Sequence, residues 1–64
     1  MTLSERIKRA RKKAKLSQRD LARLLLVSAA AVGAWETGIR KPNASHLELL
    51  PKACRISAIN FWRD

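Results

Sequence analysis

The stretch QRDLARLLLVSAAAVGAWE, residues 18–36, contains two short helix-forming segments separated by a turn. Ser17 precedes the first segment and Ser28 opens the second, and serine caps helices because its hydroxyl accepts a backbone N–H of the first turn. The carboxylate of Asp20, three residues after Ser17, can complete this capping interaction, and its negative charge suits the positive end of the helix dipole. The spacing predicts a helix-turn-helix made of helices over about 18–25 and 29–36.

Helix signals continue on both sides of this stretch. Thr2 followed by Glu5 forms a capping box, after which apolar residues recur with helical spacing at Leu3, Ile7, Ala10 and Ala14. No segment alternates with period two over a useful length, so we expect an all-α fold. The chain is predicted to be one compact domain, residues 1–64, of five helices over about 3–14, 18–25, 29–36, 44–53 and 58–62.

Packing of these helices predicts a core and one buried ion pair. Ala22 is small enough for the two motif helices to cross closely, and the wedge beside the first helix is expected to hold Leu21, Leu25, Val32 and Trp35. Arg11 lies four residues after Ile7, and Glu36 lies four after Val32, so both face inward. Because a half-buried guanidinium needs a carboxylate, we predict an Arg11–Glu36 pair.

Pro51 does not fit a regular helix. It stands eight residues into the fourth predicted helix, where it removes the bond to the carbonyl of Leu47 and clashes with that turn. We expect a kink at this point or a helix split at Leu50.

The charge of the chain indicates a polyanionic partner. Its 64 residues include 14 Lys and Arg against five Asp and Glu, a formal net charge of +9. Nine of the basic residues fall in the first 23 positions, opposed only by Glu5 and Asp20. A solvated helix surface usually mixes the two signs, and a compact domain with this imbalance repels itself unless it meets a polyanion. Nucleic acid is the leading candidate partner.

Other classes of protein are poorly supported. The single cysteine, Cys54, cannot form an internal disulfide, and no run of metal ligands is present, so we expect no metal and no cofactor. No apolar run approaches the ~18 residues that span a bilayer, and the basic N-terminus lacks the apolar core of a secretory signal. These features predict a cytoplasmic protein without a membrane or small-molecule partner. No paired acid, base or nucleophile indicates an enzyme.

The spacing of residue types in the motif resembles that of the Cro/C1-type helix-turn-helix family of lambdoid phage repressors and related bacterial regulators. The matching positions are Gln18, Leu21, Ala22, Val27, Ser28, Val32, Trp35 and Glu36. This resemblance implies a transcriptional repressor that binds a pseudo-palindromic double-stranded DNA operator as a dimer, with the helix over 29–36 in the major groove. An alternative is a protein-interaction module, such as an antitoxin whose basic surface meets an acidic toxin.

The resemblance also implies site residues. Gln18 is similar to the family glutamine that meets a phosphate at a helix N-terminus, and the loop after the second motif helix is similar to one that follows the DNA backbone. Related domains meet their partner on the operator at positions that correspond here to Ile56, Ser57, Ala58 and Ile59. The predicted DNA-binding residues are Gln18, Ser28, Ala29, Ala30, Gly33, Ala34, Thr37, Arg40, Lys41 and Asn43.

Two departures from the family pattern raise questions. Family members usually have glycine where this chain has Leu26, since the turn needs a left-handed residue; either Leu26 has a positive φ or the turn is reshaped. The outer face of the second motif helix, Ala29, Ala30, Gly33 and Ala34, offers no side-chain hydrogen bond. Its methyl groups would contact thymine methyls, or the helix touches no DNA, or the sequence is a redesigned one.

Overall fold

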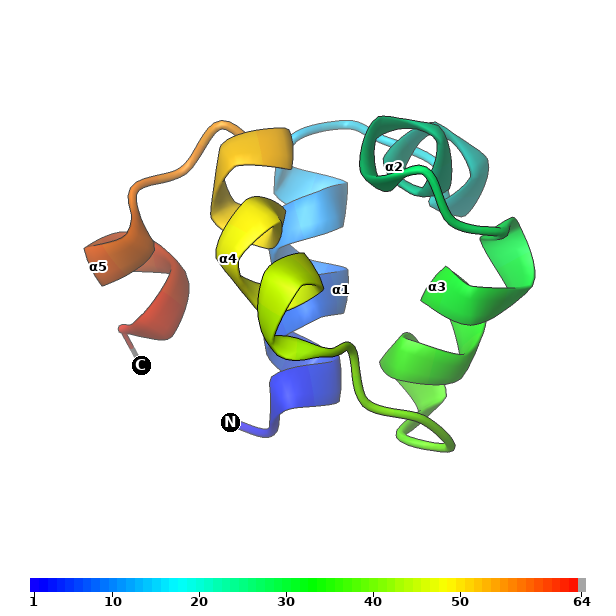
Figure 1. Ribbon diagram of the computed structural model, residues 1–64. Coiled ribbons are helices and arrows are strands. Elements are labelled where there is room, and N and C mark those ends of the chain that lie inside the picture. The colour runs from blue at the N-terminus through cyan, green and yellow to red at the C-terminus, as the bar shows by residue number, and fades with distance from the viewer. Residues whose placement is uncertain (64) are drawn as a thin grey trace.

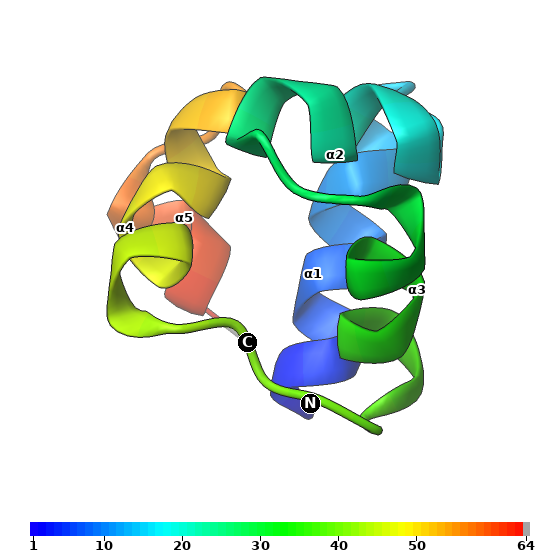
Figure 2. The same ribbon diagram turned by 45° about the vertical axis from the view of Figure 1, so that its right-hand side comes forward.

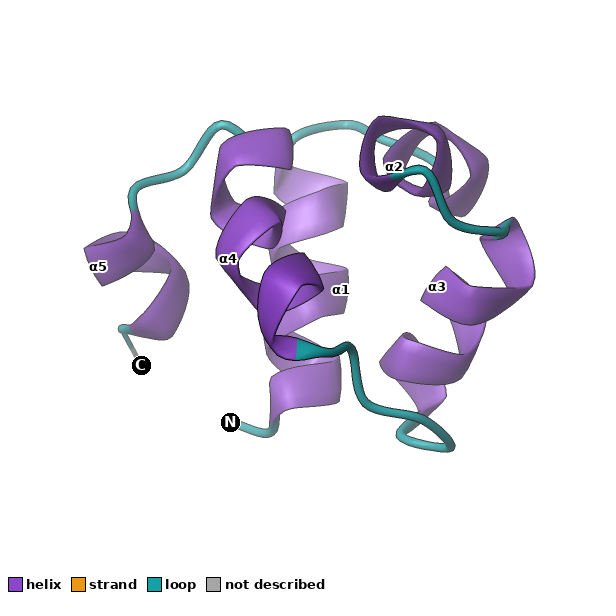
Figure 3. Ribbon diagram, viewed as in Figure 1, coloured by secondary structure: helices purple, strands orange, loops and turns teal. Residues whose placement is uncertain are grey.

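Five α-helices follow one another in the computed structural model, which describes residues 1–63 (Figures 1 and 3). Their bounds are α1 Leu3–Lys13, α2 Gln18–Leu25, α3 Ala29–Thr37, α4 Ala44–Ala53 and α5 Ala58–Trp62. The all-α class is confirmed, and the predicted ends differ by one residue at α1 and α3. No helix among the described residues has the length and apolarity that a membrane-spanning helix needs.

α1 runs through the middle of the molecule, with α3 on one side and α5 on the other (Figures 1 and 2). α2 packs on α3 and α4, and both α1 and α4 contact α5. Ile7 of α1, Leu21 of α2, Val32 of α3 and Leu50 of α4 are fully buried at this junction. The remaining core residues are Ala10, Ala22, Leu25, Trp35, Cys54 and Phe61, so the predicted wedge between the helices is confirmed.

Every helix begins with a polar side chain that caps its first turn. Thr2 and Ser17 form full capping boxes, because the carboxylates of Glu5 and Asp20 accept the backbone N–H of the capping residue at 2.8 and 3.0 Å. These backbone hydrogen bonds lower the pKa of both carboxyl groups. The other caps are Ser28, Asn43 and Ser57. The helix starts that the sequence predicted are therefore set by local hydrogen bonds.

Three helices end in the same way, with a left-handed residue that is not glycine. The residues are Lys15, Leu26 and Arg55, with φ of 61°, 58° and 55°. In each case the next backbone N–H bonds five residues back, from Leu16 to Arg11, from Val27 to Ala22 and from Ile56 to Pro51, at 3.1, 2.9 and 3.0 Å. These three following residues pack against the core. The arrangement is a Schellman cap closed by an apolar contact.

Leu26 shows which of the two predicted turns is present. Its φ of 58° and ψ of 43° are left-handed, so the family geometry is kept and the reshaped turn is wrong. Its side chain is 91% exposed and gains almost nothing from burial. The strain at this position is therefore not offset by packing.

We expect Leu26→Gly to stabilise the domain by about 1 kcal/mol, since glycine adopts a positive φ without a clashing Cβ. The melting temperature should rise by about 4–8 °C in a thermal unfolding experiment. Leu24→Gly is the matched control, because Leu24 is a 57% exposed leucine inside α2. That change should destabilise by about 1 kcal/mol. Equal loss in both variants would contradict the strain at Leu26.

The predicted split of the fourth helix at Leu50 is wrong. α4 continues as one helix from Ala44 to Ala53 with Pro51 inside it. Proline removes one bond of the ladder, but the next turn is held by the N–H of Cys54, which donates to the carbonyl of Leu50 at 3.0 Å. Leu50 and Pro51 are both buried, so burial of these two side chains opposes the cost of the missing bond.

Candidate nucleic-acid interface

The outer face of α3 carries only small side chains. Val32 and Trp35 point into the core with 0% and 5% exposure, as predicted. On the other side, Ala29 and Ala30 are exposed, while Gly33 and Ala34 are half-buried. The face therefore presents methyl groups and backbone, with no polar side chain between its two ends.

A shallow depression on this face is lined by small residues and one basic residue. Its lining residues are Ser28, Ala30, Ala31, Ala34 and Arg40. The backbone N–H of Arg40 donates to the carbonyl of Ala34 at 3.2 Å, which holds the loop against the end of α3. Arg40 was predicted from the sequence to follow the DNA backbone, and its place in the same depression as the alanines was not predicted. The run of small residues was the available signal, because it leaves space along the helix for a long side chain.

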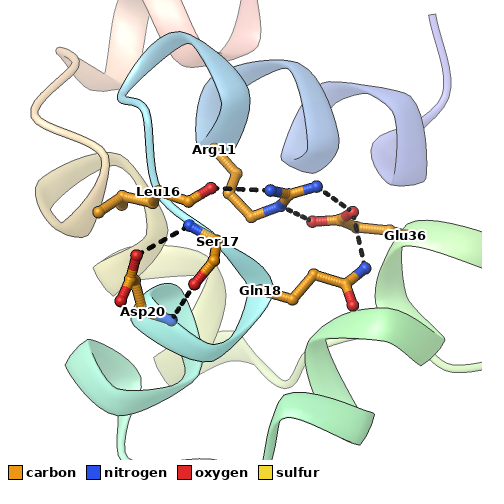
Figure 4. A network of polar contacts seen from close by, with 6 residues as sticks. All are labelled: Arg11, Leu16, Ser17, Gln18, Asp20 and Glu36. Carbon is orange, nitrogen blue, oxygen red and sulfur yellow. Dashed lines mark hydrogen bonds and ion pairs between the residues drawn. The ribbon is translucent and has the colours of Figure 1, made fainter.

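Gln18 is the first residue of α2, and its side chain turns toward α3 (Figure 4). Its Nε2 donates to Oε1 of Glu36 at 3.2 Å. Its Oε1 lies 3.6 Å from the position that a Cβ on Gly33 would take. The absence of a side chain at Gly33 thus leaves room for the Gln18 amide. One amide hydrogen is used inside the domain, and the amide is held at the edge of α3.

The predicted Arg11–Glu36 pair is confirmed and joins α1 to α3 (Figure 4). Arg11 Nε and Nη2 donate to the two carboxylate oxygens of Glu36 at 2.6 and 3.1 Å. Arg11 Nη1 also donates to the carbonyl of Leu16 at 2.8 Å. The two side chains are 10% and 3% exposed. The hydrogen bonds to Glu36 raise the pKa of Arg11, although burial opposes this shift.

Three further predicted residues act as local caps at the surface. The hydroxyl of Ser28 accepts the N–H of Ala31 at 3.1 Å, and Thr37 donates its hydroxyl to the carbonyl of Ala34 at 3.2 Å. Asn43 Oδ1 accepts the N–H of His46 at 2.8 Å. These three residues and Lys41 are exposed. The candidate interface therefore consists of α3, both of its ends and the following loop.

The segment predicted to meet a second copy lies on and before α5. Ile56 is partly buried and packs against the core, and Ser57 caps α5. Ala58 is exposed, and Ile59 is 72% exposed. Only part of the predicted patch is therefore open to a partner.

Arg6 holds α5 in place, a role that was not predicted from the sequence. Its guanidinium is almost buried and donates to the carbonyls of Phe61 and Arg63 at 2.9 and 3.0 Å. It also lies 5.6 Å from the ring centre of Trp62. A cation at the end of a short helix satisfies carbonyls that lack helical N–H partners. From the sequence, Arg6 was grouped with the basic residues expected to face a polyanion. No local pattern distinguishes Arg6 from those residues.

Two short helices that cross at a capped turn, with an exposed second helix and a basic loop beyond it, define a DNA-binding helix-turn-helix domain. Residues 7–59 match the family described as helix-turn-helix, and the chain belongs to that family. The Cro/C1-type resemblance of the sequence is thereby confirmed.

One relative of the chain is a transcriptional regulator. The chain is 39% identical over 57 residues to the HTH-type transcriptional regulator DicA of Escherichia coli strain K12, a match that covers 89% of this chain and 42% of DicA. The chain therefore spans less than half the length of that regulator.

Solved structures share the fold. The P22 c2 repressor in complex with a synthetic operator has a TM-score of 0.83 at 34% identity, covering 95% of this chain and 92% of that one. A mutant of the restriction-modification controller protein C.Esp1396I has a TM-score of 0.85 at 28% identity, covering 94% and 80%.

Proposed function

We propose that this domain binds a pseudo-palindromic operator as a dimer, inserts α3 into the major groove and represses transcription by occupying the site. The exposed outer face of α3, bordered by Arg40 and the basic loop, is the observation that carries the proposal. A helix without protruding side chains can approach the floor of the groove closely. The operator complex of the P22 c2 repressor, a structural neighbour, supports DNA as the partner. As a DNA-binding regulator, the protein would act in the cytoplasm.

Discrimination between bases would come from two kinds of contact. The methyl groups of Ala29, Ala30 and Ala34 would pack on thymine methyls, and the shape of the DNA would add to the preference. Arg40 lies next to two of these alanines and has the fork of donors that fits the O6 and N7 of guanine. We therefore assign Arg40 to base edges as well as to the backbone.

The remaining predicted contacts would set the register of the domain on DNA. Lys41 and Asn43 in the loop and Gln18 at the start of α2 are proposed to meet phosphates, which carry no sequence information. One N–H of Gln18 is already engaged by Glu36, so a phosphate would receive the other. Ser28 and Thr37 at the two ends of α3 complete the proposed surface.

Pairing on DNA is proposed to use Ile56, Ser57, Ala58 and Ile59. Since Ile56 packs mainly on its own core, the contact offers few apolar groups. A patch of this size is far below that of a stable dimer, so the protein should be monomeric in dilute solution and paired on the operator.

Substitution of deoxyuridine for thymine tests the reading of bases by α3. On an operator selected from random duplexes, one or two positions per half-site should weaken by roughly 1 kcal/mol, the value of a buried methyl group. Each change removes a methyl and leaves every hydrogen bond in place, and quantitative gel shifts measure the affinity.

Two variants serve as controls for this test. Ala30→Gln should shift the preference toward adenine at the contacted position, because an amide pairs with adenine N6 and N7. Arg40→Ala should relax selection at a G·C pair and leave the deoxyuridine effects unchanged. Insensitivity to every uracil, while base-pair changes at the same positions abolish binding, would show that the methyl groups do not read the site.

A further inference from the structure

A groove on the side of the molecule away from α3 takes no part in the proposed DNA interface. It lies between α1 and the chain from the end of α4 through α5, and its volume is about 450 Å³. None of the predicted DNA-binding residues lines it, and it shares only Ile56 with the patch proposed for pairing on DNA. α5 and α3 lie on opposite sides of α1, so DNA held by α3 would leave the groove open (Figures 1 and 2).

Apart from Arg6, the floor of the groove is apolar, and its rim is cationic. Ala10, Cys54 and Phe61 are buried residues of the floor, and Ala14 and Ile56 extend it. The charged lining comes from α1, the loop after α4 and the end of α5, and its exposed members are Arg9, Lys13, Arg55 and Arg63. Burial raises the pKa of the Cys54 thiol, so the thiol remains uncharged at neutral pH. Arg6, whose guanidinium is engaged by α5, is the charged residue of the buried lining.

The positive charge of the rim is not balanced within residues 1–63. Their acidic side chains lie elsewhere, and none lines the groove: Glu5, Asp20, Glu36 and Glu48. Arg9 and Lys13 stand four residues apart on the exposed side of α1, where like charges repel and weaken a helix. A bound anion would relieve this repulsion.

We propose that this groove binds an acidic peptide segment that carries an apolar side chain. Carboxylates would meet Arg9, Lys13 and Arg55, while the apolar side chain would cover Ala10 and Phe61. A DNA backbone has no protruding apolar side chain that could enter the groove and cover this floor. A second copy of the chain, proposed above to meet the patch that includes Ile56 on DNA, would bring its own net charge of +9 and would not neutralise the cationic rim. Charge and shape together therefore favour an acidic peptide over both.

A peptide of defined composition tests this proposal on the full chain. The probe is a fluorescent peptide with a central Leu-Phe pair between runs of Glu, and anisotropy measures its binding. Arg9→Glu combined with Lys13→Glu should weaken binding roughly tenfold or more, since attraction becomes repulsion at two sites. Lys8→Glu combined with Lys12→Glu is the matched control, because it makes the same charge change at exposed positions of α1 outside the groove.

Two further readouts locate the peptide. The methyl resonances of Ala10, Ala14 and Ile56 should shift on binding, and those of Ala29 and Ala30 on α3 should stay in place. Replacing the Leu-Phe pair of the probe by Ser-Ser should weaken binding roughly tenfold. This is the affinity that partial burial of one or two apolar side chains contributes. Circular dichroism confirms that both charge variants fold.

The proposal is overturned if both pairs of substitutions weaken the peptide equally, or if the Ser-Ser probe binds as well as the parent, since either result shows general charge attraction. It is also overturned if random duplex DNA shifts the methyl groups of Ala10 and Ala14 and the peptide does not. None of these outcomes depends on whether α3 reads an operator.

Discussion

A Glu36→Ala variant should lose about 3–5 kcal/mol of folding free energy, because the change leaves the guanidinium of Arg11 charged and almost buried without its carboxylate. At roughly 0.05–0.15 kcal/mol per residue, a chain of this length has only about 3–10 kcal/mol to lose. The pair also anchors Gln18 through the second bond to Glu36 Oε1. Most of the variant should therefore be unfolded or close to unfolding at 37 °C.

Thermal and urea unfolding followed by circular dichroism measure this loss. Glu48→Ala is the matched control, because Glu48 is an exposed carboxylate on α4 and its removal should change stability by less than about 0.5 kcal/mol. Arg11→Met combined with Glu36→Leu should recover much of the stability, since no buried charge is left alone. A Glu36→Ala protein that melts within a few degrees of the parent would show that the pair contributes little.

Binding to an operator should weaken steeply as salt is added. Arg40 and Lys41 from two copies give roughly four cationic phosphate contacts. If the exposed Arg19 and Arg23 of α2 add contacts from the other side, the number rises to roughly eight, and each contact releases about 0.9 counterions. The affinity should then fall roughly 10²–10⁴-fold between 50 and 200 mM salt. Arg6 is left out of this count because it is engaged at the end of α5.

Titrations at several salt concentrations give the slope of log K against log salt. Lys41→Ala should reduce that slope by about two for a dimer, one for each lost contact, and should weaken all sequences alike. Lys52→Ala is the control, since Lys52 is an exposed cation in the last turn of α4. A slope near zero for the parent protein would exclude binding driven by phosphate contacts.

Local signals predicted most of the fold. Caps such as Ser17 with Asp20 mark a helix start with residues three apart, and the spacing of Ile7 to Arg11 and of Val32 to Glu36 placed both partners of the ion pair toward the core. These predictions succeeded because each depends on neighbours within one helical turn. Leu26 was also correctly identified as the strained position of the turn, with the choice between two geometries left to the structure.

Contacts between distant segments were not predictable in the same way. Arg6 reaches the carbonyls of Phe61 and Arg63 across more than fifty positions of the chain, and nothing in its own surroundings separates it from other exposed cations. Gln18 turns toward Glu36 because Gly33 leaves space, which depends on how α2 crosses α3. Pro51 stays inside one helix because Leu50 and Pro51 are both buried. The expectation that proline breaks a helix takes no account of such burial.

The left-handed residues Lys15, Leu26 and Arg55 bear on how long the protein lasts in a cell. Each places a Cβ where glycine would place none. The free energy of unfolding is therefore smaller than that of the same fold with three glycines. Cellular proteases act on the unfolded fraction, and a change of 1–2 kcal/mol alters abundance several-fold. If the domain occupies an operator as proposed, a lower folding stability would shorten the time for which the gene stays occupied after synthesis stops.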